Sequence, residues 1–191
     1  MKTTHLALFA FSMTTLAVPA AALSEPQFRH ADALQLVELQ RQGLLEIGSH
    51  LDELERLRRR AASPSSTSQL RQRLHNQALV HLAAIDAIAS TTEFEGTPLL
   101  SGDLLRVQLQ TAPDSSELIY MYPPGVELID LAIDFIDLSE IFEAQVAETA
   151  IANAIEQVDY LKQGNCSVRA ELGIPDACPH ARSFCPAPSA Q

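Results

Sequence analysis

The sequence predicts a mainly α-helical protein in which long antiparallel helices pack together beside a β-hairpin. Apolar residues recur at three- and four-residue steps through three long segments, residues 31–62, 68–90 and 139–164. A short segment of alternating apolar and polar residues and an apolar return strand flank a Pro-Asp-Ser-Ser turn at 113–116. The chain has 191 residues, enough for one domain of ordinary size with a tail.

The first 22 residues are typical of a Sec-type signal peptide. Lys2 precedes an apolar run, and a run of three alanines that ends at Ala22 supplies a small-residue cleavage site. An apolar run of roughly a dozen residues is too short to cross about 30 Å of hydrocarbon. We therefore expect cleavage after Ala22, no membrane span in the mature chain, and a periplasmic or extracellular location.

The segment 31–62 predicts one long helix with a narrow apolar stripe. Leu44 and Leu51 lie seven residues apart, and Ile47 and Leu54 repeat the same step on a neighbouring row. Such a stripe suits a seam against one or two partner helices. Two glycines inside the segment, Gly43 and Gly48, are expected to weaken this helix modestly.

Two further helices are expected to complete the seam. A breaker at 63–68, containing Pro64 and five hydroxyl residues, separates the first helix from a second over 68–90, so these two helices should form an antiparallel hairpin. A third helix over 139–164 has a stripe rich in alanine, which permits close approach. The first helix is expected to bury Leu44, Ile47, Leu51 and Leu54 against Ile85 of the second and Ile151, Ile155 and Val158 of the third.

Between the second and third helices the apolar period changes to two. Leu105, Val107 and Leu109 alternate with polar residues, and a return strand over 117–122 stops at Pro123. This pattern predicts a β-hairpin. The segment 126–138 is too irregular to assign to a helix or a strand.

The charge balance argues against nucleic acid as a partner. The chain has 24 acidic and 13 basic residues and a formal net charge of −11 at pH 7, and such a surface repels phosphate backbones. The one basic cluster holds four arginines at 56–60, at the C-terminal end of the first predicted helix. Cations there offset the helix dipole, so we expect this cluster to be solvated.

All three cysteines lie in the last 26 residues, where we expect an irregular tail over 165–191. An exported protein meets an environment in which disulfides persist. Cys178 and Cys185 flank a short loop and are the favoured pair, although sequence alone does not fix the connectivity with Cys166. A zinc set made of these cysteines and His180 is an alternative, but it lacks a paired C-x-x-C element.

No reactive centre is evident, so we expect neither enzymatic activity nor a cofactor. His75 and His81 lie six residues apart and do not share a helix face, and Glu93 and Glu95 have no nucleophile beside them. Acidic residues from Asp130 to Glu140 have helical spacing but lack the loop of an EF-hand, which favours a solvated acidic edge over a calcium site.

The most informative stretch follows the second predicted helix. It reads Ile88-Ala89-Ser90-Thr91-Thr92-Glu93-Phe94-Glu95-Gly96, followed by Pro98-Leu99-Leu100-Ser101-Gly102. This stretch resembles the turn of bacterial flagellins that ends a long helix and opens a β-hairpin. Phe94 is expected to close the end of the seam and Gly96 to supply a turn that larger residues resist. The motif residues are Thr91, Thr92, Glu93, Phe94, Gly96, Leu99, Leu100 and Gly102.

The resemblance extends over roughly residues 31–163. Leu44-Leu45-Glu46-Ile47 precedes the turn, and the later Ile136-Asp137-Leu138-Ser139 and the helix containing Ala150-Ile151-Ala152-Asn153-Ala154-Ile155 are similar to the flagellin C-terminal core helix. The resemblance implies a flagellin-like core domain, here over 23–164. The chain departs from the family because it lacks the terminal helices of the filament core, carries a Sec-type signal and contains cysteine.

Two functions follow as expectations from the resemblance. The first is a secreted, flagellin-like structural protein that acts through helix-mediated packing, with itself or flagellin subunits as partners and the flagellum as one location. The alternative is a non-polymerising periplasmic or extracellular binding module built on the same core.

Overall fold

Three long helices dominate the computed structural model, which describes residues 25–174. They are α1 (His30–Ala61), α2 (Ser68–Thr91) and α3 (Ile141–Glu171). The predicted mainly α-helical fold is confirmed, and α1 and α2 begin and end within one residue of the predicted bounds. The predicted signal peptide and the predicted Cys178–Cys185 pair lie outside the described residues.

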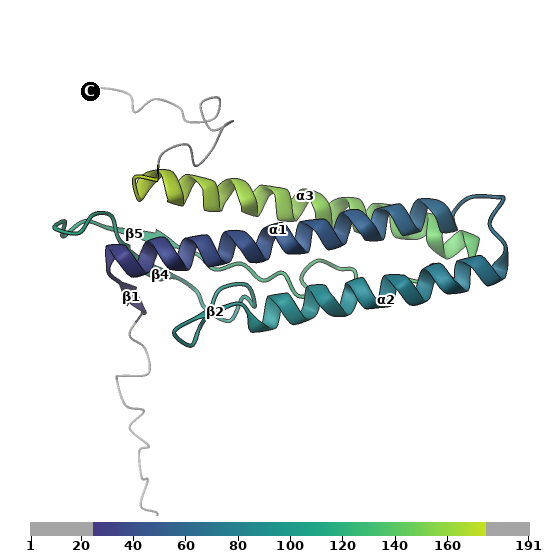
Figure 1. Cartoon of the computed structure of the whole chain (residues 1–191), viewed down its shortest axis with the longest axis horizontal. Coiled ribbons are helices and arrows are strands. Elements are labelled where there is room, and N and C mark those ends of the chain that lie inside the picture. Colours follow the sequence, from purple (N-terminus) through teal and green to yellow (C-terminus); the bar gives the residue numbers. More distant parts are fainter. Residues whose placement is uncertain (1–24, 175–191) are drawn as a thin grey trace, which may run out of the picture.

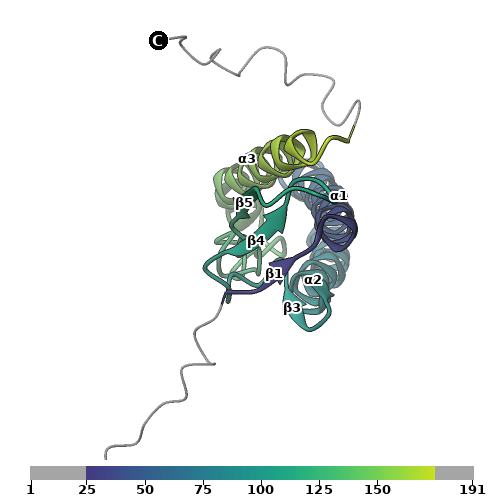
Figure 2. The ribbon, with the colours of Figure 1, turned by 90° about the vertical axis from the view of Figure 1, so that its left-hand side faces the viewer.

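The helix α1 lies between the other two and packs against both of them. Asn165 of α3 contacts Val37 near the start of α1, whereas Glu148 contacts Arg58 near its end, so α1 and α3 run antiparallel. The short connection at 62–67 makes α2 antiparallel to α1 as well (Figure 1). Viewed end-on, the three helices form an arc with the strands on one side of it (Figure 2).

Two small sheets complete the fold. The predicted hairpin is formed by β4 (Val107–Gln110) and β5 (Leu118–Met121), which pair antiparallel. A strand that the sequence did not predict, β1 (Gln27–Phe28), pairs parallel with β4 on its other edge. The second sheet contains β2 (Glu93–Phe94) and β3 (Thr97–Pro98), in the turn that follows α2.

The irregular segment between β5 and α3 closes the core on the strand side of the arc. Val126, Leu131, Ile133 and Leu138 are almost fully buried, although the segment has turns rather than helix or strand. It is held at both ends by backbone hydrogen bonds. The Val126 amide donates to the Leu100 carbonyl, and the Leu138 amide donates to Nδ1 of His75 on α2.

The third helix is longer than predicted, because Gly164 does not end it. A glycine inside a helix costs only about 1 kcal/mol, and the next turn is anchored by the buried Asn165. The helix ends instead at Glu171, and Gly173, which follows the C-cap residue Leu172, has a φ of 77°. The Gly173 amide donates to the Ala170 carbonyl and the Ile174 amide to the Arg169 carbonyl, as in a Schellman motif. The residues 165–171, predicted as irregular tail, therefore belong to α3.

Candidate functional site: the helix seam and the turn after α2

The residues expected in the helix seam lie in one hydrophobic cluster. The α1 stripe and the facing sides of α2 and α3 are almost completely buried along the seam. Ile155 is only partly buried and lies at the edge of the cluster. The side chains with 0% exposure are Leu44, Ile47, Leu51, Leu54, Ile85, Ile151 and Val158.

A chain of buried polar contacts crosses the seam near the start of α1. Nδ2 of Asn165 donates to the Val37 carbonyl at 3.0 Å and to Oε1 of Gln40 at 2.8 Å. The Gln40 amide group in turn donates to the Leu99 carbonyl at 3.2 Å. This chain of bonds fixes α3, α1 and the turn segment relative to one another, because a slip of one helix turn would leave buried polar groups without partners.

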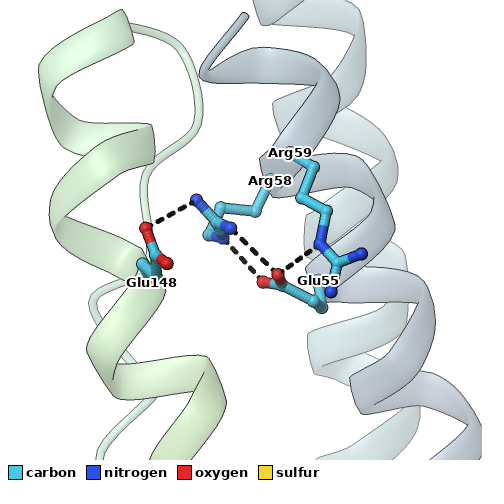
Figure 3. Close-up of polar contacts among 4 residues, drawn as sticks. All are labelled: Glu55, Arg58, Arg59 and Glu148. Atoms are coloured by element: carbon cyan, nitrogen blue, oxygen red, sulfur yellow. Dashed lines mark hydrogen bonds and ion pairs between the residues drawn. The ribbon is translucent and has the colours of Figure 1, made fainter.

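An arginine cluster joins α1 to α3 near the end of α1, as Figure 3 shows. Arg58 contacts both carboxylate oxygens of Glu55, with Nε at 2.6 Å and Nη2 at 2.9 Å, and Nη1 lies 3.4 Å from Glu148 of α3. Arg59 also donates to Glu55, at 2.6 Å. The prediction of a solvated cluster is therefore wrong for Arg58, whose side chain is 7% exposed.

Physical chemistry explains why Arg58 tolerates burial. The guanidinium is planar and matches a carboxylate with two parallel hydrogen bonds. The hydrogen bond from Arg58 holds the pKa of the Glu55 carboxyl below its ordinary value of 4.5, and the Arg59 side chain acts in the same direction. Glu55 therefore stays ionised wherever the helix pair is folded near neutral pH.

The turn after α2 begins with hydroxyl groups that bond back to the helix. The Thr91 hydroxyl donates to the Ala87 carbonyl and the Thr92 hydroxyl to the Ile88 carbonyl, each at 2.6 Å. Thr92 is the C-cap residue, and its own amide also donates to Ile88. These side-chain bonds supplement the backbone hydrogen bonds of the last helical turn and hold both threonine side chains against the helix.

The hairpin itself reverses over two residues with left-handed backbone. Glu95 has a φ of 50° and Gly96 a φ of 76°, which is the pairing that a tight two-residue hairpin requires. Phe94 then packs edge-to-face on Phe28 of β1, with ring centroids 5.7 Å apart. The turn thus contacts the strand that precedes α1, a connection that the sequence pattern did not reveal.

Leu99 and Leu100 follow the turn and lie in the core, where Leu100 packs against Gly43 of α1. Both leucines are fully buried. A Cβ at Gly43 of α1 would lie 2.6 Å from Leu100 Cδ1 and 3.2 Å from Thr92 Oγ1. Gly43 therefore permits close approach of the turn to α1, so the expectation that it only weakens the helix was incomplete.

The outward faces of α2 and α3 both expose large apolar side chains, and that of α2 is also poor in charge. Among the exposed residues of α2 only Arg73 and Asp86 are charged, whereas Leu79 and Val80 are 47% and 67% exposed. On α3, Phe142 is 66% exposed, Val146 56% and Tyr160 73%. Exposed charged residues are more numerous on the other two helices. They are Glu46, Asp52, Arg56, Arg59 and Arg60 on α1 and Glu143, Glu148, Glu156, Asp159 and Glu171 on α3.

Other candidate sites from the sequence serve the fold in the described part of the chain. Asp130 accepts from the Glu127 amide, and Asp137 accepts from the Ser139 amide and contacts His75. Within residues 25–174 no three His, Cys, Asp or Glu side chains gather as a metal would require. None of the described helices is long and apolar enough to cross a membrane. The contact between His50 and His81 was missed, because spacing within one helix does not reveal pairs between helices.

The arrangement defines a class of fold: three long helices in one layer, with a tight hairpin at the end of the second and small sheets on one side. The chain has a flagellin-like fold. It is similar to the crystal structure of Bacillus cereus flagellin, with a TM-score of 0.65 and 18% sequence identity over 75% of this chain and 82% of that one. The sequence matches no protein-family model. It also matches no curated protein.

Proposed function

We propose that this protein is an exported structural protein that acts by packing its helices against other protein subunits, and that its role is not catalytic. The observation that supports this most is the flagellin-like fold, which extends over 82% of the compared flagellin. The proposed partners are further copies of this chain or flagellin subunits. The proposed location is outside the cell or in the periplasm, with the flagellum as one site.

The outward face of α2 supports packing as the mode of action. A solvated helix face is usually rich in charge, yet this face has two charges along 24 residues and exposes neighbouring leucine and valine side chains. Interface cores are depleted of charged residues in the same way. Leu79 and Val80 are therefore the proposed contact residues on this helix.

The outward face of α3 offers a second contact surface. Phe142, Val146 and Tyr160 are each more than half exposed and come from the side of the helix opposite the buried alanines. The helices α2 and α3 flank α1 on opposite sides (Figure 2), so the two surfaces belong to separate flanks of the helix layer. A subunit with contact surfaces on two sides can join more than one neighbour, as an assembling structural protein must.

Sedimentation velocity of the chain from residue 23 onward tests this proposal. We expect association that increases with concentration, either alone or after addition of flagellin monomers from the same cells. Val80→Glu should abolish association by placing a charge in the contact, whereas Ser49→Glu, at an exposed position on α1, should leave it unchanged. A monomer at every concentration, with and without flagellin, would contradict the proposal and favour a non-polymerising binding module.

Fractionation of the native cells tests the proposed location. Mass spectrometry of periplasm, culture medium and sheared filaments should find the protein in at least one of these three fractions. Recovery in filaments supports a filament subunit, and recovery in periplasm or medium supports a separate exported subunit. Recovery only in the cytoplasm would contradict export.

A further inference from the structure

Two histidines meet between α1 and α2. Nδ1 of His50 lies 3.0 Å from Nδ1 of His81, and the ring centroids are 5.3 Å apart with planes inclined by 51°. Both side chains are half-buried. A neutral imidazole has one nitrogen that donates and one that accepts, so this contact requires one donor and one acceptor. The pair therefore holds a single proton between the two Nδ1 atoms.

The charged groups near the pair are engaged with other partners or lie elsewhere on α2. Glu53 and Arg56 of α1 act on His81 in opposite directions, and they pair with each other at 2.6 Å. The α2 sequence has no Asp, Glu, Lys or Arg between Arg73 and Asp86. In the irregular segment that also packs on α2, Asp137 contacts His75 instead.

Acid changes this contact because both rings can be protonated. Two imidazolium ions have no acceptor between them and place like charges about 3 Å apart. Burial lowers the pKa of His81 below its ordinary value of 6.5, and the neighbouring His50 adds to this effect. A lowered pKa in the folded state means that the contribution to stability is complete above about pH 6.5 and is lost as the pH falls below it.

We propose that the His50–His81 pair is an acid-sensitive clip between α1 and α2, closed near neutral pH and opened when both rings are protonated. The clip lies beside Ala78, Leu82 and Ile85, the residues through which the middle of α2 is buried. Opening it loosens this part of α2 and leaves α3 in place on the other side of α1. Within residues 25–174 the pair is not joined by a third His, Cys, Asp or Glu in a metal-binding group.

Amide hydrogen exchange of the whole chain tests the clip at about pH 7.5 and about pH 5, corrected for the intrinsic pH dependence of exchange. We expect protection of the amides at 78–85 to fall roughly tenfold in acid, the effect of about one pKa unit of coupling. Protection at 147–158 in α3 should change little. Equal protection of 78–85 at both pH values would overturn the proposal.

Substitutions assign the response to the pair. The double variant His50→Gln and His81→Gln keeps a donor and an acceptor at each position but cannot titrate, so the acid response of 78–85 should disappear. His75→Gln removes another histidine of α2, and this variant should keep the acid response of 78–85. A response that persists in the double variant would overturn the proposal.

A second measurement needs no variant. Nuclear magnetic resonance titration of the wild-type imidazoles should show the pair taking up its two protons in steps separated by about one pH unit or more. Two independent steps at the ordinary histidine value would also overturn the proposal. Neither readout depends on the proposed subunit partners, so the clip and the proposed function can fail separately.

Discussion

Gly43→Ala and Gly164→Ala form a matched test of the packing between α1 and the turn after α2. Both changes add one methyl group to a helix interior, which by itself stabilises a helix by about 1 kcal/mol. At position 164 the new Cβ would have nothing within 4 Å, so that gain should be realised. At position 43 the new Cβ would lie 2.6 Å from Leu100 Cδ1, and Leu100 is fully buried in the core.

Overpacking of a buried site costs about 1–3 kcal/mol, so Gly43→Ala should lose about 1 kcal/mol after its helix gain is subtracted. The two variants should then differ by about 2 kcal/mol in the free energy of unfolding. For a chain of this size that is roughly 4–8 °C in Tm. Thermal and urea unfolding followed by far-ultraviolet circular dichroism measures both quantities. The packing argument is refuted if Gly43→Ala proves as stable as Gly164→Ala.

Two further predictions concern the seam and the arginine cluster. Leu51→Asp places a charge in a fully buried position and should cost about 3 kcal/mol of the free energy of unfolding. Leu45→Asp, at a 45% exposed position of the same helix, should cost far less. Urea unfolding measures both, and unchanged stability of Leu51→Asp would contradict the burial of this position in the helix seam. Glu55→Gln should cost about 2 kcal/mol near neutral pH, because it leaves the buried Arg58 without its paired carboxylate. The pKa of Glu55 is lowered from 4.5 in the folded protein, so the contribution of Glu55 to stability is present above about pH 4.5 and is lost below it. Glu55→Gln should therefore lose less stability than the wild type as the pH falls below about 4.5. Equal pH dependence of stability in both proteins would contradict this.

Elements with a strong local pattern could be predicted from the sequence. The α1 stripe repeats over many turns and the breaker at 63–68 is compact. The first hairpin strand alternates and a proline turn follows it, so each element carries its own signal. The turn after α2 was found through family resemblance, and its left-handed Glu95 and Gly96 give the tight reversal that the resemblance implied.

Features that depend on distant pairing could not be predicted. The strand β1 has two residues and pairs with β4 some 80 positions later, so no local period reveals it. Arg58 belongs to a run of arginines that looks solvated, yet it is buried and also contacts Glu148 of α3, 90 positions later. Asn165 follows a glycine and precedes a cysteine, a context typical of a loop, yet its amide bonds to α1 keep the helix intact.

The central position of α1 has a consequence for the order of folding. Only the residues 62–67 separate α1 from α2, whereas α3 begins at Ile141, after both sheets have been synthesised. Closing the short loop costs little chain entropy, so the α1–α2 hairpin can form while the rest of the chain is still emerging. Until α3 arrives, the side of α1 that carries Val37, Gly48 and Arg58 has no cover. A nascent or truncated chain that stops before residue 141 therefore leaves this side of α1 exposed, and chaperones would be expected to hold that form of the protein.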